Sequence, residues 1–157
     1  MTLNTISLQP VGFVRSQRRE PIDDGWDRIS ARIELDADQF TSEALLGLDT
    51  FSHVDVIYYF NQVRDAKIEH GARHPRGNTD WPRIGIFSQR GKNRPNRLGH
   101  TTCKVCRVDG LTLHVEGLDA IDGTPVLDLK PVMSGFLPRG DVREPDWSLE
   151  LMRGYWI

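Results

Sequence analysis

Apolar and polar residues alternate along much of this chain, and the alternation predicts β-strands. The clearest case is residues 28–35, where every second side chain is apolar and Ser30, Arg32 and Glu34 stand between them. A period of two puts successive side chains on opposite faces of a strand, so one face of this segment is expected to be buried. Segments rich in β-branched and aromatic residues, or bounded by turn residues, predict further strands at 6–15, 52–63, 84–88, 101–108, 112–117 and 126–129. Short strands at this spacing favour a small β-barrel or a β-sandwich.

Three segments depart from the strand pattern. Asp36 is a candidate N-cap for one short helix over residues 37–46, where apolar residues fall at near-helical spacing and Gly47 supplies a stop. Residues 64–82 contain frequent Gly and Pro and predict a long loop, which in a compact domain is usually functional or mobile. The tail from residue 133 onward combines Gly and Pro with later aromatic residues, and it predicts an extended segment held by aromatic contacts.

Length and composition predict one domain over residues 1–157, located in the cytoplasm. The chain has 157 residues and 38% hydrophobic content, enough for one buried core but not for two. The amino-terminal segment carries no basic stretch leading into an apolar one, and the longest apolar run, residues 56–60, is too short to cross a bilayer. The two cysteines, Cys103 and Cys106, are too few for a disulfide scaffold. No membrane segment is expected.

The charges are unevenly distributed along the chain. The net charge is -2, yet residues 81–108 contain seven Lys or Arg residues and no Asp or Glu. A cationic segment on an otherwise acidic protein attracts anions locally, so a phosphate-bearing partner is one interpretation. A solvated basic loop explains the same composition. Within the segment Pro95 adds stiffness, and Gly91 and Gly99 permit close backbone approach.

Familiar metal-binding and nucleotide-binding patterns are missing from the sequence. Cys103 and Cys106 have the spacing of half a zinc site, but no second pair follows, and residues three apart in a strand point to opposite faces. His70 and His74 are four apart, but the Gly and Pro beside them argue against the helix that would bring both to one face. Glycine-rich phosphate loops and a nucleophile elbow do not occur. No metal site is expected, and nucleotide-binding and hydrolase functions have no motif support.

A second unusual segment, residues 117–131, holds three carboxylates near a Gly-Thr-Pro turn. These are Asp119, Asp122 and Asp128, and Lys130 follows them. Carboxylates this close are costly unless they are solvated, paired or facing a cationic ligand. Asp128 and Lys130 would share one face of a strand because they are two residues apart. The segment could therefore face a cationic ligand, or it could be a tight turn capped by Asp122 with a surface ion pair beside it.

Six separated motifs occur in one order along the chain. They are Val11-Gly12-Phe13-Val14-Arg15-Ser16, Leu46-Gly47-Leu48-Asp49-Thr50-Phe51-Ser52-His53, Gly85-Ile86-Phe87, Arg94-Pro95-Asn96, Asp122-Gly123-Thr124-Pro125 and Asp128-Leu129-Lys130-Pro131. Together they resemble the TsaA-like family of S-adenosylmethionine-dependent methyltransferases, which includes the bacterial enzyme that methylates threonylcarbamoyl-adenosine beside the anticodon. The resemblance implies a mainly β fold, a small antiparallel β-barrel, with a homodimer and a cofactor pocket near the subunit interface.

By position, the resemblance also assigns S-adenosylmethionine binding to residues from several segments. These residues are Pro21, Ile22, Asp23, Asn61, Gln62, Arg90, His100, Leu118, Asp119, Ile121, Asp122, Gly123 and Thr124. Carboxylates and amides can accept hydrogen bonds from ribose hydroxyls and the methionine ammonium, and an Arg can pair with the methionine carboxylate. Methyl transfer from a sulfonium then needs mainly in-line positioning of donor and acceptor.

The resemblance implies that the acceptor is an adenine N6 position of a modified transfer RNA. A weakly nucleophilic amine needs a group that orients it and a route for its proton, and Asp128 is the first candidate with Asp122 second. The side chains expected to hold the phosphate backbone are Lys92, Arg94, Arg97, Lys104 and Lys130. We also expect the 64–82 loop to close over the acceptor.

The chain departs from the family pattern at several positions. Arg97 stands where a proline usually follows Arg-Pro-Asn, His100-Thr101 where a serine is usual, and Val132 where a tyrosine usually follows Lys-Pro. The carboxy-terminal domain of longer bacterial relatives has no counterpart here, which predicts a short form. Two alternatives therefore stay open: a regulatory barrel that binds S-adenosylmethionine without transferring its methyl group, and a methyltransferase with another acceptor.

Overall fold

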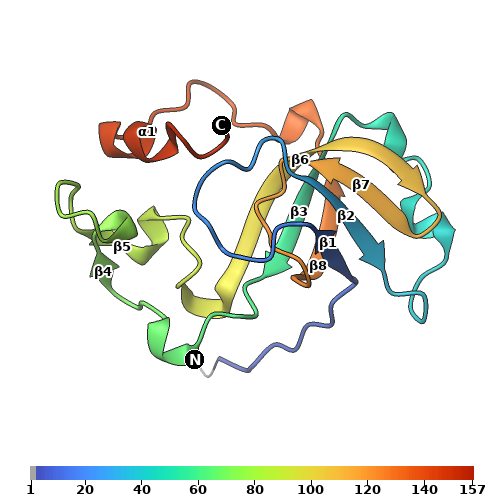
Figure 1. The fold of residues 1–157 in the computed structure, drawn as a ribbon, viewed down its shortest axis with the longest axis horizontal. Helices are drawn as coiled ribbons and strands as arrows, with labels where there is room; N and C mark the ends of the chain where they lie inside the picture. Colours follow the sequence, from blue (N-terminus) through green and yellow to red (C-terminus); the bar gives the residue numbers. More distant parts are fainter. Residues whose placement is uncertain (1–2) are drawn as a thin grey trace.

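Six antiparallel strands close into a barrel in the computed structural model, which describes residues 3–157 (Figure 1). Around the barrel the order is β1 (Gly12–Ser16), β2 (Ser30–Leu35), β7 (Thr112–Glu116), β6 (Leu98–Asp109), β3 (His53–Tyr59) and β8 (Pro125–Pro131). Outside the barrel, β4 (Ala72–Arg73) pairs with β5 (Ile84–Gly85), and the helix α1 (Asp146–Met152) lies near the carboxyl end. This architecture confirms the predicted mainly β fold and antiparallel barrel.

Alternating side chains fill the inside of the barrel. In β2, Ala31 and Ile33 are buried while Arg32 points outward, as the alternation predicts. β3 has the same period, and Val56 and Tyr58 are at most 2% exposed. Full burial of one such side chain contributes about 1.5–3 kcal/mol. Because apolar side chains occupy the interior, a ligand can bind only at the ends or on the outer surface of the barrel.

β6 is the longest strand and connects two sides of the barrel. Its first part, Leu98–Lys104, pairs with β3, and its later part pairs with β7, with an irregularity between Val105 and Arg107. The turn between β6 and β7 uses Gly110 in the left-handed region, with φ of 59°. This turn separates the strands predicted at 101–108 and 112–117.

The helix predicted over residues 37–46 does not form, and this prediction is wrong. Asp36 instead caps a single turn, because its carboxylate accepts hydrogen bonds from a backbone N–H and from the Gln39 amide. Thr41 is then extended, with φ of -102° and ψ of 169°, and a short 3-10 segment, Ser42–Leu45, follows. The side chain of Asp36 thereby favours a local turn over a continued helix.

The prediction of an extended tail is wrong over α1. Pro145 precedes the helix, and Asp146 lies in its first turn, where a carboxylate is favourable. Trp147 and Leu151 are four residues apart on one side of α1, and both are half-buried. The seven-residue helix is attached to the 64–82 loop, because Nε1 of Trp81 donates a hydrogen bond to Glu150 at 2.8 Å.

Several other segments form single 3-10 turns. They are Leu48–Thr50, Asp65–Lys67, Pro75–Gly77, Ile86–Ser88, Pro95–Arg97 and Ser134–Phe136. The strand predicted at 84–88 therefore ends after Gly85, where the chain turns. None of the helices in residues 3–157 has the length and apolarity that a membrane crossing requires.

Three connections emerge at the same end of the barrel. They are residues 17–29 after β1, 60–97 after β3 and 117–124 after β7. The pairing register places them together, since Ser16 pairs with Ala31 and Tyr59 with Leu98 at this end. We call it the loop end. In Figure 1 the first two connections extend to the left of the barrel, the second of them contains β4 and β5, and α1 lies on the same side.

Candidate functional site

The loop end gathers the predicted cofactor residues from four parts of the chain. They lie in the 17–29 connection (Pro21, Ile22, Asp23), directly after β3 (Asn61, Gln62), before and within the start of β6 (Arg90, His100), and in the 117–124 connection (Leu118, Asp119, Ile121, Asp122, Gly123, Thr124). Antiparallel pairing brings these segments to one end of the barrel although they are far apart in sequence. Their cofactor role itself stays a prediction.

Asp119 lies at the centre of a network of hydroxyl groups. The Tyr58 hydroxyl donates to its Oδ1 at 2.8 Å, and the Thr101 hydroxyl donates to the same oxygen. The Tyr155 hydroxyl donates to Oδ2. Tyr58 and Thr101 are buried, at 2% and 5% exposure. This Asp119 network of four residues closes the core at the loop end and attaches the carboxyl-terminal segment to the barrel.

Gly99 makes room for the ring of Tyr58. The two residues pair across β3 and β6, and a Cβ on Gly99 would lie 2.3 Å from Cε2 of Tyr58. The close approach expected at this glycine is therefore a packing contact. It holds the Tyr58 hydroxyl in reach of Asp119.

Buried groups around this network must stay uncharged in the folded state. Burial first, and the Asp119 charge second, raise the pKa of Tyr58 far above its usual range, and the same two causes raise the pKa of the Cys103 thiol. Burial and Asp119 also raise the pKa of Tyr155. In the unfolded chain a Cys titrates near pH 8.5 and a Tyr near pH 10, at about the ordinary values.

The free energy of unfolding is therefore expected to decrease at alkaline pH. Because the pKa values of these groups are raised in the folded state, their contribution to the free energy of unfolding is fully present below about pH 8.5. The free energy of unfolding then declines as the pH rises, by about 1.4 kcal/mol per pH unit for each fully buried group. Urea unfolding between about pH 7 and pH 11 would measure the decline. A Cys103→Ala variant should show a smaller slope just above about pH 8.5. Equal stability across the range would contradict the expectation.

Arg76 connects the 64–82 loop to the 17–29 connection. Its guanidinium lies 2.9 Å from Oδ1 of Asp24 and 4.0 Å from Oδ2 of Asp23. The same group lies 5.9 Å from the centre of the Tyr155 ring. The loop, the predicted cofactor residue Asp23 and the carboxyl-terminal segment therefore meet at one place. Closure of the loop over an acceptor stays a prediction.

The carboxyl-terminal segment also pairs with the 17–29 connection through its backbone. The N–H groups of Gly25 and Trp26 donate to the carbonyl oxygens of Gly154 and Tyr155, at 3.2 and 3.0 Å. Arg18 stacks on Trp26, with its guanidinium carbon 3.9 Å from the ring centre. The wall of the loop end is thus built by segments from both ends of the chain.

Arg90 and His100 lie together beside Asp55 of β3. Arg90 donates to the backbone carbonyl of His100 at 2.6 Å, and Nε2 of His100 lies 3.1 Å from Oδ1 of Asp55. Thr102 donates to the same carboxylate oxygen at 2.5 Å. Two of the predicted cofactor residues therefore share one polar surface on β3 and β6.

The other predicted cofactor residues differ in exposure. Asn61 and Gln62 are exposed, whereas Leu118 is fully buried in the core. Thr124 is 4% exposed, and its hydroxyl donates to the carbonyl of Ile121 at 2.8 Å. Leu118 could therefore contact a ligand only through its backbone.

The two candidate catalytic carboxylates lie in different surroundings. Asp128 pairs with Lys130, at 2.9 Å between Oδ2 and Nζ, on the outer face of β8 opposite Ile57. Asp122 accepts a hydrogen bond from the Ser16 N–H at 3.1 Å, at the loop end. The surface ion pair that the sequence offered as one alternative is therefore present, whereas Asp122 bonds to the end of β1 and does not cap its own turn. The catalytic roles of both residues stay predictions.

Four of the five predicted RNA-binding side chains are bonded within the protein. Arg94 donates to a backbone carbonyl at 2.7 Å, and Arg97 donates to a tyrosine hydroxyl at 2.7 Å and pairs with a carboxylate. Lys104 and Lys130 make ion pairs, yet more than 60% of each side chain is exposed, at 64% and 63%. Lys92 is half-buried. Arg94 and Arg97 thus stabilise the loop that carries them.

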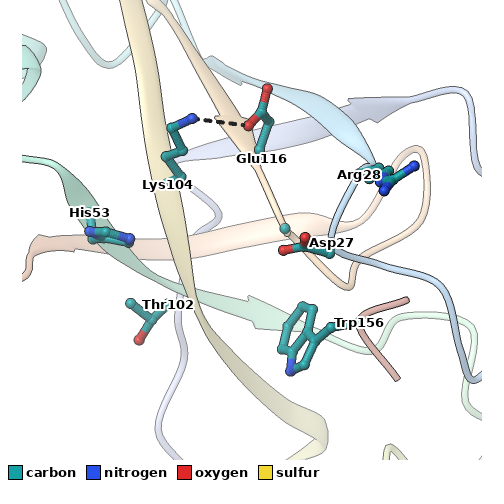
Figure 2. Close-up of a pocket in the computed structure, with 8 residues that line it drawn as sticks. Asp27, Arg28, His53, Thr102, Lys104, Glu116 and Trp156 are labelled. Atoms are coloured by element: carbon teal, nitrogen blue, oxygen red, sulfur yellow. Dashed lines mark hydrogen bonds and ion pairs between the residues drawn. The ribbon is translucent and has the colours of Figure 1, made fainter. Parts of the chain in front are cut away.

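Two open grooves on the outer surface were not anticipated from the sequence. One, of about 540 Å³, lies between the 17–29 connection, β3, β6, β7 and Trp156, and Figure 2 shows Lys104 reaching Glu116 at its edge. The other, of about 590 Å³, crosses β1, β2, β7 and β6 and extends to Asp122. Among all the predicted site residues, these grooves contain Lys104 and Asp122. The pairing of distant strands forms both grooves, so no local motif signals them.

The cysteines are placed as the strand period predicts. Cys103 is buried in the core and Cys106 is exposed. In residues 3–157, no three His, Cys, Asp or Glu side chains are grouped as a metal ion would require.

Comparison with known proteins gives consistent matches. The chain matches the tRNA-methyltransferase O N-terminal domain (TrmO_N) over residues 14–136. A human protein named tRNA (adenine(37)-N6)-methyltransferase is 32% identical over 151 residues, covering 90% of this chain and 34% of the human protein. A protein from Pyrococcus abyssi named "Probable S-adenosyl-L-methionine-binding protein" is 32% identical over 147 residues, covering 88% of this chain and 72% of that protein.

A solved structure shows the same fold. The crystal structure of TrmO from Pseudomonas aeruginosa superimposes with a TM-score of 0.71 at 28% identity, covering 89% of this chain and 62% of that one. This chain spans about a third of the human relative, at 34%. The resemblance inferred from the six motifs is thereby confirmed. The chain belongs to the TrmO (TsaA-like) family, a family of S-adenosylmethionine-dependent methyltransferases in which some members are named only as S-adenosylmethionine-binding proteins.

Proposed function

We propose that this chain is an S-adenosylmethionine-dependent methyltransferase whose acceptor is an adenine N6 position in a modified transfer RNA. The observation that carries the proposal is the convergence of residues 21–23, 61–62, 90–100 and 118–124 at the loop end. Family membership and the name of the human relative support it. Transfer RNA is then the partner, and the cytoplasm is the place of action.

The polar groups at the loop end suit S-adenosylmethionine by their chemistry. Asp23, Asn61 and Gln62 are exposed and can accept hydrogen bonds from an ammonium group and from ribose hydroxyls. Arg90 is exposed and donates one N–H to a backbone carbonyl, which leaves further N–H groups for a carboxylate. The bound cofactor supplies a methyl group on a sulfonium. The task of these residues is therefore to bind and align, because in-line positioning accounts for most of the catalysis expected here.

We also propose that a homodimer completes the site. Seven of the thirteen predicted cofactor residues are exposed in one chain, and Phe87, three residues before Arg90, is 77% exposed. Large exposed apolar side chains mark interaction surfaces. Sedimentation analysis should give a mass twice that of one chain, with dissociation in a Phe87→Glu variant. A monomer at all concentrations would contradict the dimer.

Replacing Asp128 by asparagine is expected to lower kcat for methyl transfer by about 100-fold, because the neutral amide keeps the shape of the side chain but cannot take a proton from the acceptor amine. Transfer of a labelled methyl group to transfer RNA measures the rate. Affinity for S-adenosylmethionine should stay unchanged, since Asp128 lies on the outer face of β8 beside Lys130. The exposed Asp141→Asn variant is the matched control, and full activity of Asp128→Asn would remove Asp128 from the mechanism.

A regulatory barrel without transfer activity is the second candidate. Its support is the Pyrococcus abyssi relative, of which this chain covers 72% and which is named as a binding protein. Calorimetric titration with S-adenosylmethionine and S-adenosylhomocysteine, followed by methyl transfer to transfer RNA, separates the two candidates. Binding with transfer supports the enzyme, and binding without transfer supports the regulatory barrel. No binding by the folded protein would contradict both.

A further inference from the structure

We propose that a row of basic side chains on the outer face of the barrel binds the phosphate backbone of an RNA strand. The basic row consists of Arg15 on β1, Arg32 on β2, His114 on β7 and Arg107 on β6. The inference rests on the proposed function, which it deepens by stating where the RNA backbone runs. None of these four residues belongs to the set that the sequence predicted for RNA binding.

The strand register places the four residues side by side. Arg15 pairs with Arg32, Arg32 with His114, and His114 with Arg107. Residues that pair directly share one face of a sheet, and their chain neighbours Val14, Ala31, Leu113 and Val115 point into the core. With neighbouring strands about 4.8 Å apart, the row spans about 14 Å, which is long enough to face more than one phosphate.

The row is short of acidic partners. Glu34 forms ion pairs with two arginines. Its carboxylate oxygens lie 2.9 Å from Nε of Arg15 and 3.8 Å from Nη2 of Arg32. Arg107 lies 4.0 Å from Asp109. The three arginine side chains are 46%, 55% and 63% exposed, so they keep donors that face solvent. Like charges directly opposite one another destabilise a sheet, and an anionic strand lying along the row would offset that repulsion.

The row lies in a groove that leads toward the predicted cofactor residues. The groove of about 590 Å³ contains the whole row, gains Arg19 from the 17–29 connection and extends to Asp122 at the loop end. Its two acidic residues are engaged, since Glu116 lies 3.4 Å from Nζ of Lys104 and Asp122 accepts from a backbone N–H. A concave, cationic path that continues to the loop end fits a phosphodiester backbone, which is recognised by charge rather than by base sequence.

Substitutions that remove positive charge from the row test the proposal. In an Arg32→Ala, Arg107→Ala double variant, affinity for unfractionated transfer RNA should fall by about tenfold or more. Each lost phosphate contact should reduce the slope of log affinity against log salt by about 0.7–0.9, measured by fluorescence anisotropy between about 50 and 200 mM NaCl. The Arg32→Lys, Arg107→Lys variant keeps the charges and should keep the slope. The Arg143→Ala variant, in an exposed part of the tail, is the matched control and should bind as the wild type does.

The outcomes separate this inference from the proposed function. If the wild type transfers methyl groups to transfer RNA and the double alanine variant keeps the affinity and salt slope, the groove is not the RNA path, although the function stands. If the double alanine variant loses affinity and slope while the wild type binds RNA without transferring methyl groups, the groove is supported and the proposed function fails. Absence of any RNA binding by the folded wild type would overturn the groove.

Discussion

Replacing Gly12 by alanine is expected to open the barrel and to lower the free energy of unfolding by about 3 kcal/mol or more. A Cβ at this position would lie 2.3 Å from the carbonyl oxygen of Glu34 and 3.0 Å from Cα of Leu35. Both are backbone atoms of β2, so no side-chain rotation relieves the contact. Gly12 also pairs with Val126 of β8, and moving β1 away from β2 therefore strains the barrel on both sides.

A matched glycine separates this steric effect from the general effect of losing a glycine. A Cβ on Gly135 would meet no atom of the described residues within 4 Å, and its φ is not left-handed. Gly135→Ala should therefore change the free energy of unfolding by no more than about 0.5 kcal/mol. Urea unfolding followed by tryptophan fluorescence measures both variants. Equal midpoints for Gly12→Ala and the wild type would show that β1 and β2 can separate without cost.

The barrel strands could be predicted because burial on one face imposes a period of two. In β2 and β3, the positions that alternate in sequence are the positions that alternate between core and solvent. The failed helix at 37–46 has a different cause. Leu45 is the buried residue of its 3-10 segment, so no apolar face forms there, and the bonds of Asp36 decide the local turn. Hydrophobic spacing alone does not report such side-chain competition.

The α1 helix shows the limit of periodicity in a short element. Of its apolar residues only Trp147 and Leu151 form a half-buried pair at helical spacing, and an extended segment with two anchors could also contain that pair. The Pro145-Asp146 pair at its start was the available signal, since Pro and an acidic residue favour a helix amino terminus.

The basic residues that cluster in the sequence and the basic residues that cluster in the folded structure lie on different surfaces. The basic residues of 81–108 are neighbours in the chain, but Arg94 is bonded to the backbone of Gln89 and Arg97 to Tyr59 of β3. Arg15 and Arg107 lie far apart in sequence and become neighbours of Arg32 and His114 only through the strand register. A local count therefore finds the basic loop, whereas finding the basic row requires the topology.

Replacing Asp119 by alanine is expected to lower the free energy of unfolding by about 2–4 kcal/mol, because the buried hydroxyls of Tyr58 and Thr101 lose their shared acceptor. These two hydroxyls lie 3.2 Å apart and can still bond to each other, which keeps the loss below the cost of two isolated buried groups. Tyr155 loses its acceptor as well, so the carboxyl-terminal segment should become more mobile. Urea unfolding gives the first effect, and hydrogen exchange of residues 154–157 gives the second.

The Asp119→Asn variant separates hydrogen bonding from charge in the same network. Its carbonyl oxygen can still accept from Tyr58 and Thr101, and its amide can donate to the Tyr155 hydroxyl, which both donates and accepts. The loss of stability should therefore stay below about 1 kcal/mol. A double-mutant cycle of Asp119→Ala with Tyr155→Phe should give a coupling energy of about 0.5 kcal/mol or more, because each variant removes the same bond. Additive effects would show that Tyr155 is held by its other contacts, with Arg76 and Trp156.

The same pair of variants tests whether Asp119 binds the cofactor directly. Its two oxygens accept from three hydroxyls of the protein, which makes it a residue that positions the loop end. On that account Asp119→Asn should bind S-adenosylmethionine as tightly as the wild type, and Asp119→Ala should bind more weakly only to the extent that the loop end no longer populates its binding-competent arrangement. A loss of about tenfold or more in Asp119→Asn, with stability unchanged, would instead assign the negative charge to the methionine ammonium. Calorimetric titration of the two variants therefore decides between a structural carboxylate and a ligand-binding one.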